Sequence, residues 1–336
     1  MKTQISSLEF SHFPVMLSEI IQISSPIKGG LFIDCTFGGG SYSNAILQFP
    51  HTKVIGIDRD DAVISIAQKL EKKFKNRFRF LKLKFSQIDK VLENYVDTVI
   101  FDLGLSSIQL NNLKRGFSFK SKDKLDMSMG LSETSAEEVV NKLSETQLKL
   151  IFKILGEEKE ASKIAKNIVR ERSKKKITKV NELVSIITKS KSRDFSKKIN
   201  PCTKTFQALR IFVNKEVTEL INGLINATKL LKPGGKILIV SFHSIEDRIV
   251  KYFFTNFSSK KSKPSRYFPE ENTLNNQLFE KYKNKIIKPS RIELDKNNPS
   301  RSAKLRFAIR SKNKFIYPSN FIQKFNKYLN IEAISV

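Results

Sequence analysis

Several residue types are scarce or missing in this chain of 336 residues. It has no tryptophan, two cysteines and three histidines, and 33 acidic residues stand against 61 basic ones. Two cysteines exclude a disulfide scaffold and are too few for a cysteine-type zinc site. Because the cysteines and histidines also lack metal-ligand spacing, we expect no protein-bound metal. The low cysteine content fits a reducing, cytoplasmic setting.

Long hydrophobic runs are missing as well. The apolar runs are short, such as residues 237–240, so no segment is long enough to span a bilayer. The N-terminal stretch includes Glu9 and no unbroken apolar segment, which argues against a secretory signal. Hydrophobic residues still make up 40% of the chain. That content suffices for one or two cores and excludes low-complexity disorder as the main state.

Positive charge is in excess and unevenly spread. The formal net charge is +28, of which residues 151–200 carry +9 and residues 251–320 carry +12. A codon bias toward lysine is the alternative explanation, but it would spread the charge more evenly. The clustering therefore favours a polyanionic partner such as nucleic acid, although charges close in sequence need not meet in space.

Four short apolar runs predict buried strands. They lie at 31–33, 54–57, 97–101 and 236–240. Three of the strands lead directly into an acid, which is Asp34, Asp58 or Asp102. A helical segment from Asp60 to Phe74 follows the second strand, and Asp60 or Asp61 can cap it. This alternation predicts βαβ units and a parallel sheet, which is an α/β fold.

The stretch between the third and fourth predicted strands is too long for one crossover. Helical periodicity covers 137–150, 157–172 and 181–188, without a strand signal of similar strength. We therefore expect an all-helical insertion at 110–205 within a core formed by residues 1–109 and 206–336. In that core, residues 206–231 read as one amphipathic helix, and the polar residues 255–300 read as a loop.

A glycine-rich turn follows the first predicted strand, in the segment LFIDCTFGGGS at 31–41. Glycine lets the backbone approach a ligand closely. Dinucleotide enzymes place a similar turn here, and a tight turn without a ligand is a simpler interpretation. Asp58 ends the next strand, where a carboxylate can either accept both ribose hydroxyls of a nucleoside or cap a helix.

The combination of these features is more specific than any one of them. Asp34 with the glycine turn, then Asp58, Asp102 and the KPGG turn at 232–235, is the layout of S-adenosylmethionine-dependent methyltransferases. Carboxylates suit the cationic groups and the ribose of that cofactor. They would repel the pyrophosphate of a dinucleotide.

The segment DLGLSSIQL at 102–110 makes the resemblance specific, since it is similar to a motif of the bacterial 16S ribosomal RNA (cytosine-N4) methyltransferase family. Further blocks agree with that family in chain order: HFPVML at 12–17, GEE at 156–158, NPCTKTFQALR at 200–210, SFHSIEDR at 241–248 and NPSRSAKLR at 298–306. The resemblance implies a class I Rossmann-like methyltransferase core with an inserted helical substrate domain. It also implies S-adenosylmethionine as cofactor and 16S rRNA in the small ribosomal subunit as substrate.

The same resemblance implies a set of cofactor contacts. They fall on Gly40, Ser41, Tyr42, Asp58, Phe85, Asp102 and Gln109. The family usually has Gly-Gly-His where this chain has Gly40-Ser41-Tyr42. A tyrosine can stack or donate through its hydroxyl, but it cannot carry a positive charge. The Cβ of Ser41 can also make the loop sit differently.

The implied reaction moves a methyl group to the exocyclic N4 amine of a cytosine in the decoding region. Because the lone pair of this amine is delocalised, acceptors for its N–H groups would help it to react. Asp102 and Ser106 follow the strand end where such acceptors belong, and His243 can orient the base or relay a proton. Each has a structural alternative: a cofactor contact for Asp102, a turn for Ser106 and a hydrogen-bonded histidine for His243.

Basic residues in the charged regions are the expected RNA contacts, which would make binding dependent on salt. The candidates are Arg115, Lys166, Arg170, Arg172, Arg301, Lys304 and Arg306. Arg115, Phe117 and Phe119 can hold an unstacked cytosine, although the two rings can equally pack between core and insertion.

Three other functions compete with this one. A cytosine-C5 methyltransferase needs a cysteine nucleophile, which Cys202 could supply, but the flanking residues fit the N4 pattern. A non-catalytic RNA-binding protein would tolerate loss of Asp58 and the glycine turn, and both are present. A Rossmann-type oxidoreductase lacks a clean glycine fingerprint and does not explain the charge. The sequence leaves open whether the protein is a monomer or a homodimer.

Overall fold

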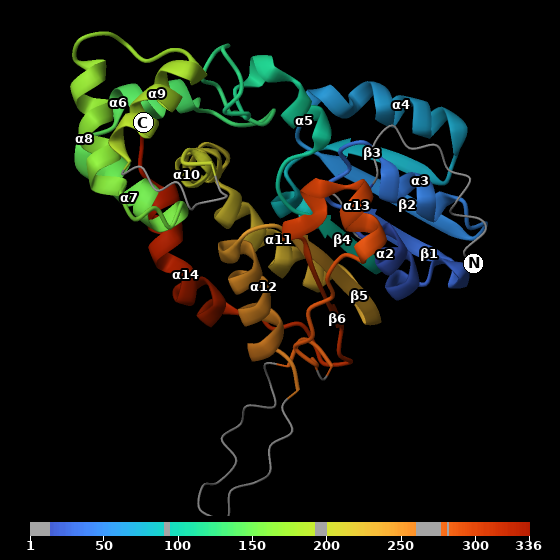
Figure 1. Ribbon diagram of the computed structural model, residues 1–336. Coiled ribbons are helices and arrows are strands. Elements are labelled where there is room, and N and C mark those ends of the chain that lie inside the picture. The colour runs from blue at the N-terminus through green and yellow to red at the C-terminus, as the bar shows by residue number, and fades with distance from the viewer. Residues whose placement is uncertain (1–13, 91–94, 192–199, 260–276, 281) are drawn as a thin grey trace, which may run out of the picture. The chain divides into compact units, whose positions relative to one another are not determined.

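A computed structural model describes residues 14–336 apart from 91–94, 192–199, 260–276 and 281 (Figure 1). The chain divides into two compact units. The first comprises Met1–Gly104 and Leu220–Ile322, and the second comprises Leu105–Glu219 and Gln323–Val336. Within the described residues, no helix is long and apolar enough to cross a membrane.

One six-stranded sheet forms the centre of the first unit (Figure 1). Its strands are β1 Gly30–Asp34, β2 Thr52–Asp58, β3 Phe78–Lys82, β4 Val96–Asp102, β5 Leu231–Ser241 and β6 Lys304–Ile309. They lie in the order β3-β2-β1-β4-β5-β6, and only β6 is antiparallel to its neighbour. This is the sheet of a Rossmann-like α/β fold, so the predicted fold class is confirmed.

Four of the six strands, β1, β2, β4 and β5, were predicted because their interiors are continuous apolar runs. Ile33, Val99 and Leu238 have no exposed surface, as expected for parallel strands covered on both faces. β3 and β6 were not predicted. β3 reads FRFLK and β6 reads KLRFAI, so charged residues interrupt both strands, which form the two edges of the sheet.

The parallel register brings three aspartates to one edge of the sheet. Asp34 lies opposite Gly56 of β2 and Ile100 of β4. Asp58 and Asp102 each lie two residues farther along those neighbouring strands. The glycine turn after β1 therefore lies between two strand ends that both carry a carboxylate.

Helices cover both faces of this sheet (Figure 1). They are α2 Leu17–Ser24, α3 Ser41–Leu47, α4 Ile64–Lys73, α12 Ser244–Asn256 and α13 Arg291–Lys296, with most of α11 Glu216–Leu230. The Asp60 side chain accepts a hydrogen bond from the Ala62 amide at 3.1 Å and caps the 3-10 turn before α4, as the sequence suggested. The expected loop at 255–300 lies partly outside the described residues. In its described part the prediction was incomplete, since α13 and a 3-10 turn, Asn298–Ser302, occur there.

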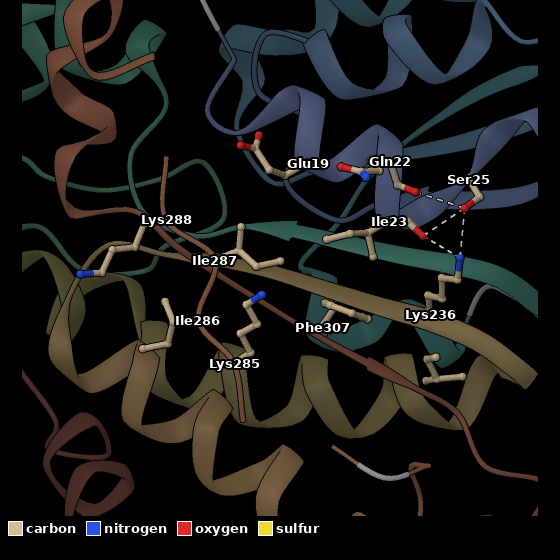
Figure 2. A pocket seen from close by; sticks show the side chains of 11 residues that line it. Glu19, Gln22, Ile23, Ser25, Lys236, Lys285, Ile286, Ile287, Lys288 and Phe307 are labelled. Carbon is tan, nitrogen blue, oxygen red and sulfur yellow. Dashed lines mark hydrogen bonds between the residues drawn. The ribbon is translucent and has the colours of Figure 1, made fainter. Parts of the chain in front are cut away.

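A groove of about 700 Å³ runs beside the end of α2 in this unit (Figure 2). Ile23, Ile287 and Phe307 form part of its apolar lining, and Lys236 reaches across one side (Figure 2). The Lys236 amine donates to the Ile23 carbonyl at 2.6 Å, near the C-terminus of α2. A cation is favourable there because helix C-termini present unpaired carbonyls. We therefore infer that Lys236 stabilises the C-terminus of α2.

Helices are the main regular elements of the second unit in its described part, and an isolated bridge joins Lys124 and Lys179. Its helices are α5 Ser107–Asn111, α6 Ala136–Lys142, α7 Glu145–Leu155, α8 Ala161–Arg172, α9 Val180–Ser190 and α10 Thr203–Asn214. The predicted helix at 137–150 is broken, because Leu143 is extended and Ser144 caps α7. The predicted helix at 206–231 is also broken, since Lys215 adopts a left-handed conformation between α10 and α11.

The unit boundaries also differ from the predicted insertion at 110–205. Residues 206–219 and 323–336 belong to the second unit. Helix α10 packs on α6 and α7 there, which explains the first difference. The C-terminal helix α14 Ser319–Glu332 ends with Glu332, whose carboxylate accepts hydrogen bonds from the amides of Val217 and Thr218 at 2.9 and 2.8 Å. This cap at the N-terminus of α11 ties the end of the chain to the second unit.

Arg306 on β6 contradicts its expected role as an RNA contact. Its side chain is only 2% exposed, and its guanidinium pairs with Asp247 at 2.7 Å. It also donates to the Tyr282 hydroxyl and to Asn284. Lys304 pairs with the same Asp247 carboxylate at 3.0 Å, though it remains partly exposed. A buried, fully engaged guanidinium stabilises the fold and is not available to phosphates.

Replacing Arg306 should therefore lower stability. We expect Arg306→Met to reduce the free energy of unfolding by about 3 kcal/mol, because it leaves the partly buried Asp247 carboxylate with Lys304 as its remaining cationic partner. Urea unfolding measures this change, with Arg301→Met at an exposed position as the control. Unchanged stability in Arg306→Met, together with weakened RNA binding, would contradict the structural role.

Candidate active site

Asp34, at the end of β1, is a buried carboxyl with an incomplete set of partners. The residue is 1% exposed, and its Oδ2 accepts a hydrogen bond from the Ser43 hydroxyl at 2.8 Å. Its Oδ1 is buried and has no hydrogen-bond partner within the described residues. Burial raises the pKa of Asp34 to about 6, although the Ser43 hydrogen bond opposes the rise. A buried acceptor without a partner indicates a place for a ligand group.

Asp102, at the end of β4, is likewise a buried carboxyl with an incomplete set of partners. Its backbone amide donates to the Thr36 hydroxyl at 2.6 Å, which fixes the strand end against the glycine turn. Its Oδ1 is buried and likewise has no partner in the described part of the chain. Burial raises the pKa of Asp102 to about 8, and the nearby Asp34, Glu246 and Glu293 carboxyls add to the rise. Asp102 is therefore largely protonated at neutral pH.

Asp58, at the end of β2, supports the glycine turn directly. Its two oxygens accept hydrogen bonds from the amides of Gly38 and Asp60, both at 2.9 Å. Burial raises the pKa of its carboxyl, while these two amides oppose the rise. Asp60, and not Asp58, provides the helix cap. Asp58 instead holds the glycine turn. Each carboxylate oxygen can accept a second hydrogen bond, which leaves room for ribose hydroxyls.

Gly40 is required by the shape of the turn. It has a φ of 71°, in the left-handed region that favours glycine, and it directly precedes α3. A Cβ at this position would lie 2.7 Å from the Phe37 ring. Ser41 begins α3 directly after this turn.

Tyr42 is buried beside these carboxyls and is 4% exposed. Its hydroxyl donates to the Val15 carbonyl. The adjacent Met16 amide donates to Glu293 of α13 at 2.8 Å. Tyr42 therefore ties the segment before α2 to α3, and its expected contact with the cofactor stays a prediction.

Phe85 packs within the first unit, in a 3-10 turn after β3. Its ring meets Phe101 edge to face with 5.3 Å between centroids. A Cβ on Gly223 of α11 would lie 2.6 Å from this ring, so the glycine allows the close approach. These contacts hold the ring in place on the sheet. Its expected contact with the cofactor stays a prediction.

His243 caps a helix. Its Nδ1 accepts a hydrogen bond from the Glu246 amide at 3.4 Å, and the Glu246 carboxylate accepts from the His243 amide, which is a capping box at the start of α12. The Nε2 atom lies 3.1 Å from a Glu246 oxygen. The geometry thus supports the interpretation of His243 as a hydrogen-bonded structural histidine.

Ser106 and Gln109 belong to the second unit and form the same kind of cap. Ser106 Oγ accepts from the Gln109 amide at 3.3 Å, and Gln109 Oε1 accepts from the Ser106 amide at 3.0 Å. The two side chains therefore stabilise the N-terminus of α5. This cap is enough to explain why the two residues lie three positions apart. The catalytic role of Ser106 and the cofactor contact of Gln109 stay predictions.

The remaining RNA candidates differ in accessibility. Lys166, Arg170 and Arg301 are exposed, and Arg170 has an ion pair with Glu171 at 3.1 Å. Arg172 donates to the Val140 carbonyl at 2.7 Å, and partial burial lowers its pKa. Arg172 is thus a packing residue as well as a cation.

Arg115 lies beside the aromatic residues that were expected to hold a base. It donates to the Ser128 carbonyl at 2.7 Å and lies 5.3 Å from the Phe117 ring centroid. Phe117 is 6% exposed, and Phe119 meets Phe206 edge to face within the second unit. Phe117 is therefore buried in that unit, whereas Phe119 packs on Phe206 and stays partly exposed.

Cys202 is buried at the start of α10 and is 1% exposed. Burial raises the pKa of its thiol, which keeps it protonated at neutral pH. A nucleophilic cysteine needs the thiolate, so this environment argues against the C5 mechanism.

The sequence analysis missed several residues that support the site. Ser43 bonds the Asp34 carboxyl, and Thr36 accepts a hydrogen bond from the Asp102 amide. Val15 accepts from the Tyr42 hydroxyl, and Glu293 accepts from the neighbouring Met16 amide. Ser43 and Thr36 flank the glycine turn, so their position in the sequence could have indicated that they belong to the site. No sequence pattern indicates Glu293, because it lies 277 residues from its partner Met16.

The fold and the site together define a class of protein. A sheet of this order with an antiparallel last strand, a glycine turn after β1, and carboxyls at the ends of β1, β2 and β4 is a class I methyltransferase core.

Comparison with known proteins specifies the family within this class. A family model described as the MraW methylase family matches residues 9–311. A Bartonella grahamii protein named ribosomal RNA small subunit methyltransferase H is 43% identical over 300 residues, which are 89% of this chain and 90% of that protein. The Ehrlichia ruminantium (strain Welgevonden) protein of the same name is 44% identical over 302 residues, which are 88% of this chain and 98% of that protein. The chain therefore belongs to the MraW methylase family.

Similarity to solved structures is more distant. A putative rRNA-methylase from Clostridium thermocellum has 14% identity and a TM-score of 0.39, and the match covers 89% of this chain and 99% of that one. The fold class consequently rests on the strand order and register of this chain.

S-adenosylmethionine is the cofactor of this methylase, and the residues present fit it. Asp34 and Asp102 each have a buried oxygen that no other described residue contacts by a hydrogen bond, and these oxygens suit a ligand with positive charge. The Asp58 carboxylate suits neutral hydroxyls. When bound, the cofactor supplies an electrophilic methyl group on a sulfonium. The chain supplies negative charge, hydrogen-bond acceptors and a turn that allows close approach.

Gly40 offers a test of the turn. We expect Gly40→Ala to lower the free energy of unfolding by about 1–3 kcal/mol, because alanine is strained at this φ and its Cβ collides with Phe37. Gly39→Ala is the matched control, since the nearest atom to its Cβ would be Ser41 Oγ at 4.0 Å. Urea unfolding of both variants measures the difference, and equal stability of the two would contradict the assigned strain.

Proposed function

We propose that this methylase transfers a methyl group from S-adenosylmethionine to the exocyclic N4 amine of cytosine 1402 of 16S rRNA, in the usual rRNA numbering. The observation that carries the proposal is the pair of carboxyls Asp34 and Asp102 at the carboxyl edge of a methyltransferase sheet, each with one buried oxygen that has no partner among the described residues. The relatives' names support small-subunit ribosomal RNA as the substrate. The motif DLGLSSIQL at 102–110 supports the N4 amine. A ribosomal substrate implies a cytoplasmic enzyme.

Asp102 is the residue that we assign to the amine. A carboxyl at the end of β4 can accept an N–H hydrogen bond from the amine, which orients its lone pair toward the methyl group. The methylated nitrogen then carries a proton to lose. In its ionised form the Asp102 carboxylate can accept that proton, and burial, which raises the pKa of Asp102 to about 8, makes it a stronger acceptor than an ordinary carboxylate.

Exposed cations supply the expected contacts to RNA. Lys166 and Arg170 lie on α8 of the second unit, and Arg301 lies in the first unit. We retain these three as phosphate contacts and keep Arg115, Arg172 and Lys304 as partly engaged candidates. Arg306 is withdrawn because it is buried.

A non-catalytic RNA-binding protein is the second candidate. Such a protein would have no need for two carboxyls that each bury an oxygen without a partner in the described residues, because that arrangement is costly unless a ligand completes it. The presence of these groups favours the enzyme.

Methyl transfer onto ribosomal subunits tests the proposal directly. Small subunits from a strain without this activity are incubated with the protein and methyl-labelled cofactor, and the labelled nucleotide is identified by mass spectrometry. We expect N4-methylcytosine at position 1402. We expect Asp102→Ala to lower the rate at least about a hundredfold, as loss of a positioned acceptor does. Label at carbon 5 or on another nucleotide would refute the proposal.

Cys202 distinguishes the N4 from the C5 mechanism. Cys202→Ala should retain most of the methyl transfer activity, since its thiol is buried and protonated. The rate with saturating cofactor measures this, and urea unfolding controls for the small cavity. Complete loss of transfer in a folded variant would support a cysteine nucleophile.

A further inference from the structure

The short helix α13 presents a large apolar side chain to solvent. Ile292 is 71% exposed, which is the largest exposed fraction among the large hydrophobic residues that the structure describes. Leu294 on the same helix is 36% exposed. Single exposed hydrophobic residues are common and need no explanation. The position of α13 and the charges around it make Ile292 a different case.

Hydrogen bonds fix α13 on the first unit. Ser290 Oγ accepts from the Glu293 amide at 3.2 Å and caps the helix at its N-terminus. The Glu293 carboxylate is buried and accepts from the Met16 amide at 2.8 Å. At the other end, the Asn297 amide donates to the Glu293 carbonyl at 2.7 Å. A loose loop would let an isoleucine fold back onto the protein, whereas this fixed helix holds Ile292 outward.

α13 lies at the carboxyl edge of the sheet, next to the start of α2 (Figure 1). The Met16 amide that bonds α13 directly follows Val15, whose carbonyl accepts from the Tyr42 hydroxyl of α3, just after the glycine turn. The 3-10 turn Asn298–Ser302 packs on α13 and leads into β6. Because β6 is antiparallel to β5, it begins at the edge where β5 ends. α13 therefore borders the edge that carries the candidate active site.

Basic side chains accompany Ile292. Arg291 precedes it, Lys288 comes shortly before the helix, and Arg301 lies in the turn that packs on α13; all three are exposed. Within the described residues, Arg291 and Arg301 form no ion pair. The exposed Asp295 on α13 offsets only part of this charge. An apolar side chain among cations suits RNA, because RNA combines the flat faces of bases with charged phosphates.

We propose that Ile292 is a wedge for the substrate RNA: it packs against the face of an unstacked base next to the target nucleotide, while Arg291 and Arg301 contact the flanking phosphates. The apolar contact compensates for the stacking that the RNA loses when its target base leaves the stack. The proposal rests on the RNA substrate of the proposed function. It does not depend on which atom of the target base receives the methyl group.

Equilibrium binding to unmethylated small ribosomal subunits tests the apolar contact without any cofactor. We expect Ile292→Ser to weaken binding about fivefold to tenfold, because burial of the isoleucine against a base is lost. The dependence of affinity on salt should not change, since no charge is removed. Ile292→Met keeps an apolar side chain and should bind nearly as the wild type.

Ile27→Ser is the matched control. Ile27 is 61% exposed and has a basic neighbour, Lys28. It lies in the first unit just before β1 begins, which is the opposite edge of the sheet. This variant should bind as the wild type. Arg291→Gln provides the complementary result, since loss of one phosphate contact should lower the slope of log affinity against log salt by about one.

A photo-crosslink from position 292 identifies what Ile292 touches. The two cysteines of the chain are buried, so a benzophenone maleimide reacts selectively with the exposed thiol of Ile292→Cys. After irradiation with intact subunits, we expect crosslinks to 16S rRNA near the target cytosine. The same label on Ile27→Cys should give no such crosslink.

Three results would overturn the proposal. They are unchanged binding by Ile292→Ser, an equal loss of binding in Ile27→Ser, and crosslinks from position 292 to a ribosomal protein alone, which would assign α13 to an acidic protein partner. Thermal unfolding verifies that each variant is folded, and the crosslink remains available if Ile292→Ser is not. A failure of cytosine N4 methylation would leave these binding results unchanged, so the two proposals fail separately.

Discussion

Burial of carboxyls at one edge of a parallel sheet is the constraint on which the rest of the site depends. Asp34 and Asp102 end neighbouring strands, and each has a buried oxygen without a partner in the described residues. Burying a charge in this way is unfavourable unless protons or a cation compensate it. The raised pKa values of both groups express that cost in the free protein. A cationic cofactor offsets the cost of burying these carboxyls, so the arrangement of the strand ends favours binding of that cofactor.

The surrounding residues keep these carboxyls in position. Thr36 anchors the backbone of Asp102, Ser43 holds Asp34, and Asp58 holds the glycine turn between them. Gly40 allows the turn to pass close to Phe37. The binding site thus arises from short-range contacts around one strand-turn-helix unit. These contacts position the carboxyls before any ligand arrives, which is the arrangement that favours tight binding.

The sequence predicted those parts of the structure that depend on local pattern. The buried strands β1, β2, β4 and β5 have continuous apolar runs, and the three strand-end aspartates follow from them. β6 was missed because its Arg306 looks like a surface residue, and only a partner 59 positions away, Asp247, makes its burial possible. His243 and Ser106 were read as chemical groups because a helix cap and a catalytic residue use the same side chains. Glu293 and Val15 reach the site through tertiary packing, which no local pattern encodes.

The central claim is that the strand-end carboxyls hold the cofactor, and the affinity of Asp58→Asn for S-adenosylmethionine tests it most directly. Asparagine keeps the size of the side chain but loses the charge and one acceptor. We expect calorimetric titration to show affinity at least about tenfold weaker than that of the wild type, because hydrogen bonds to a charged acceptor are lost. Unchanged affinity in a folded Asp58→Asn protein would contradict the claim.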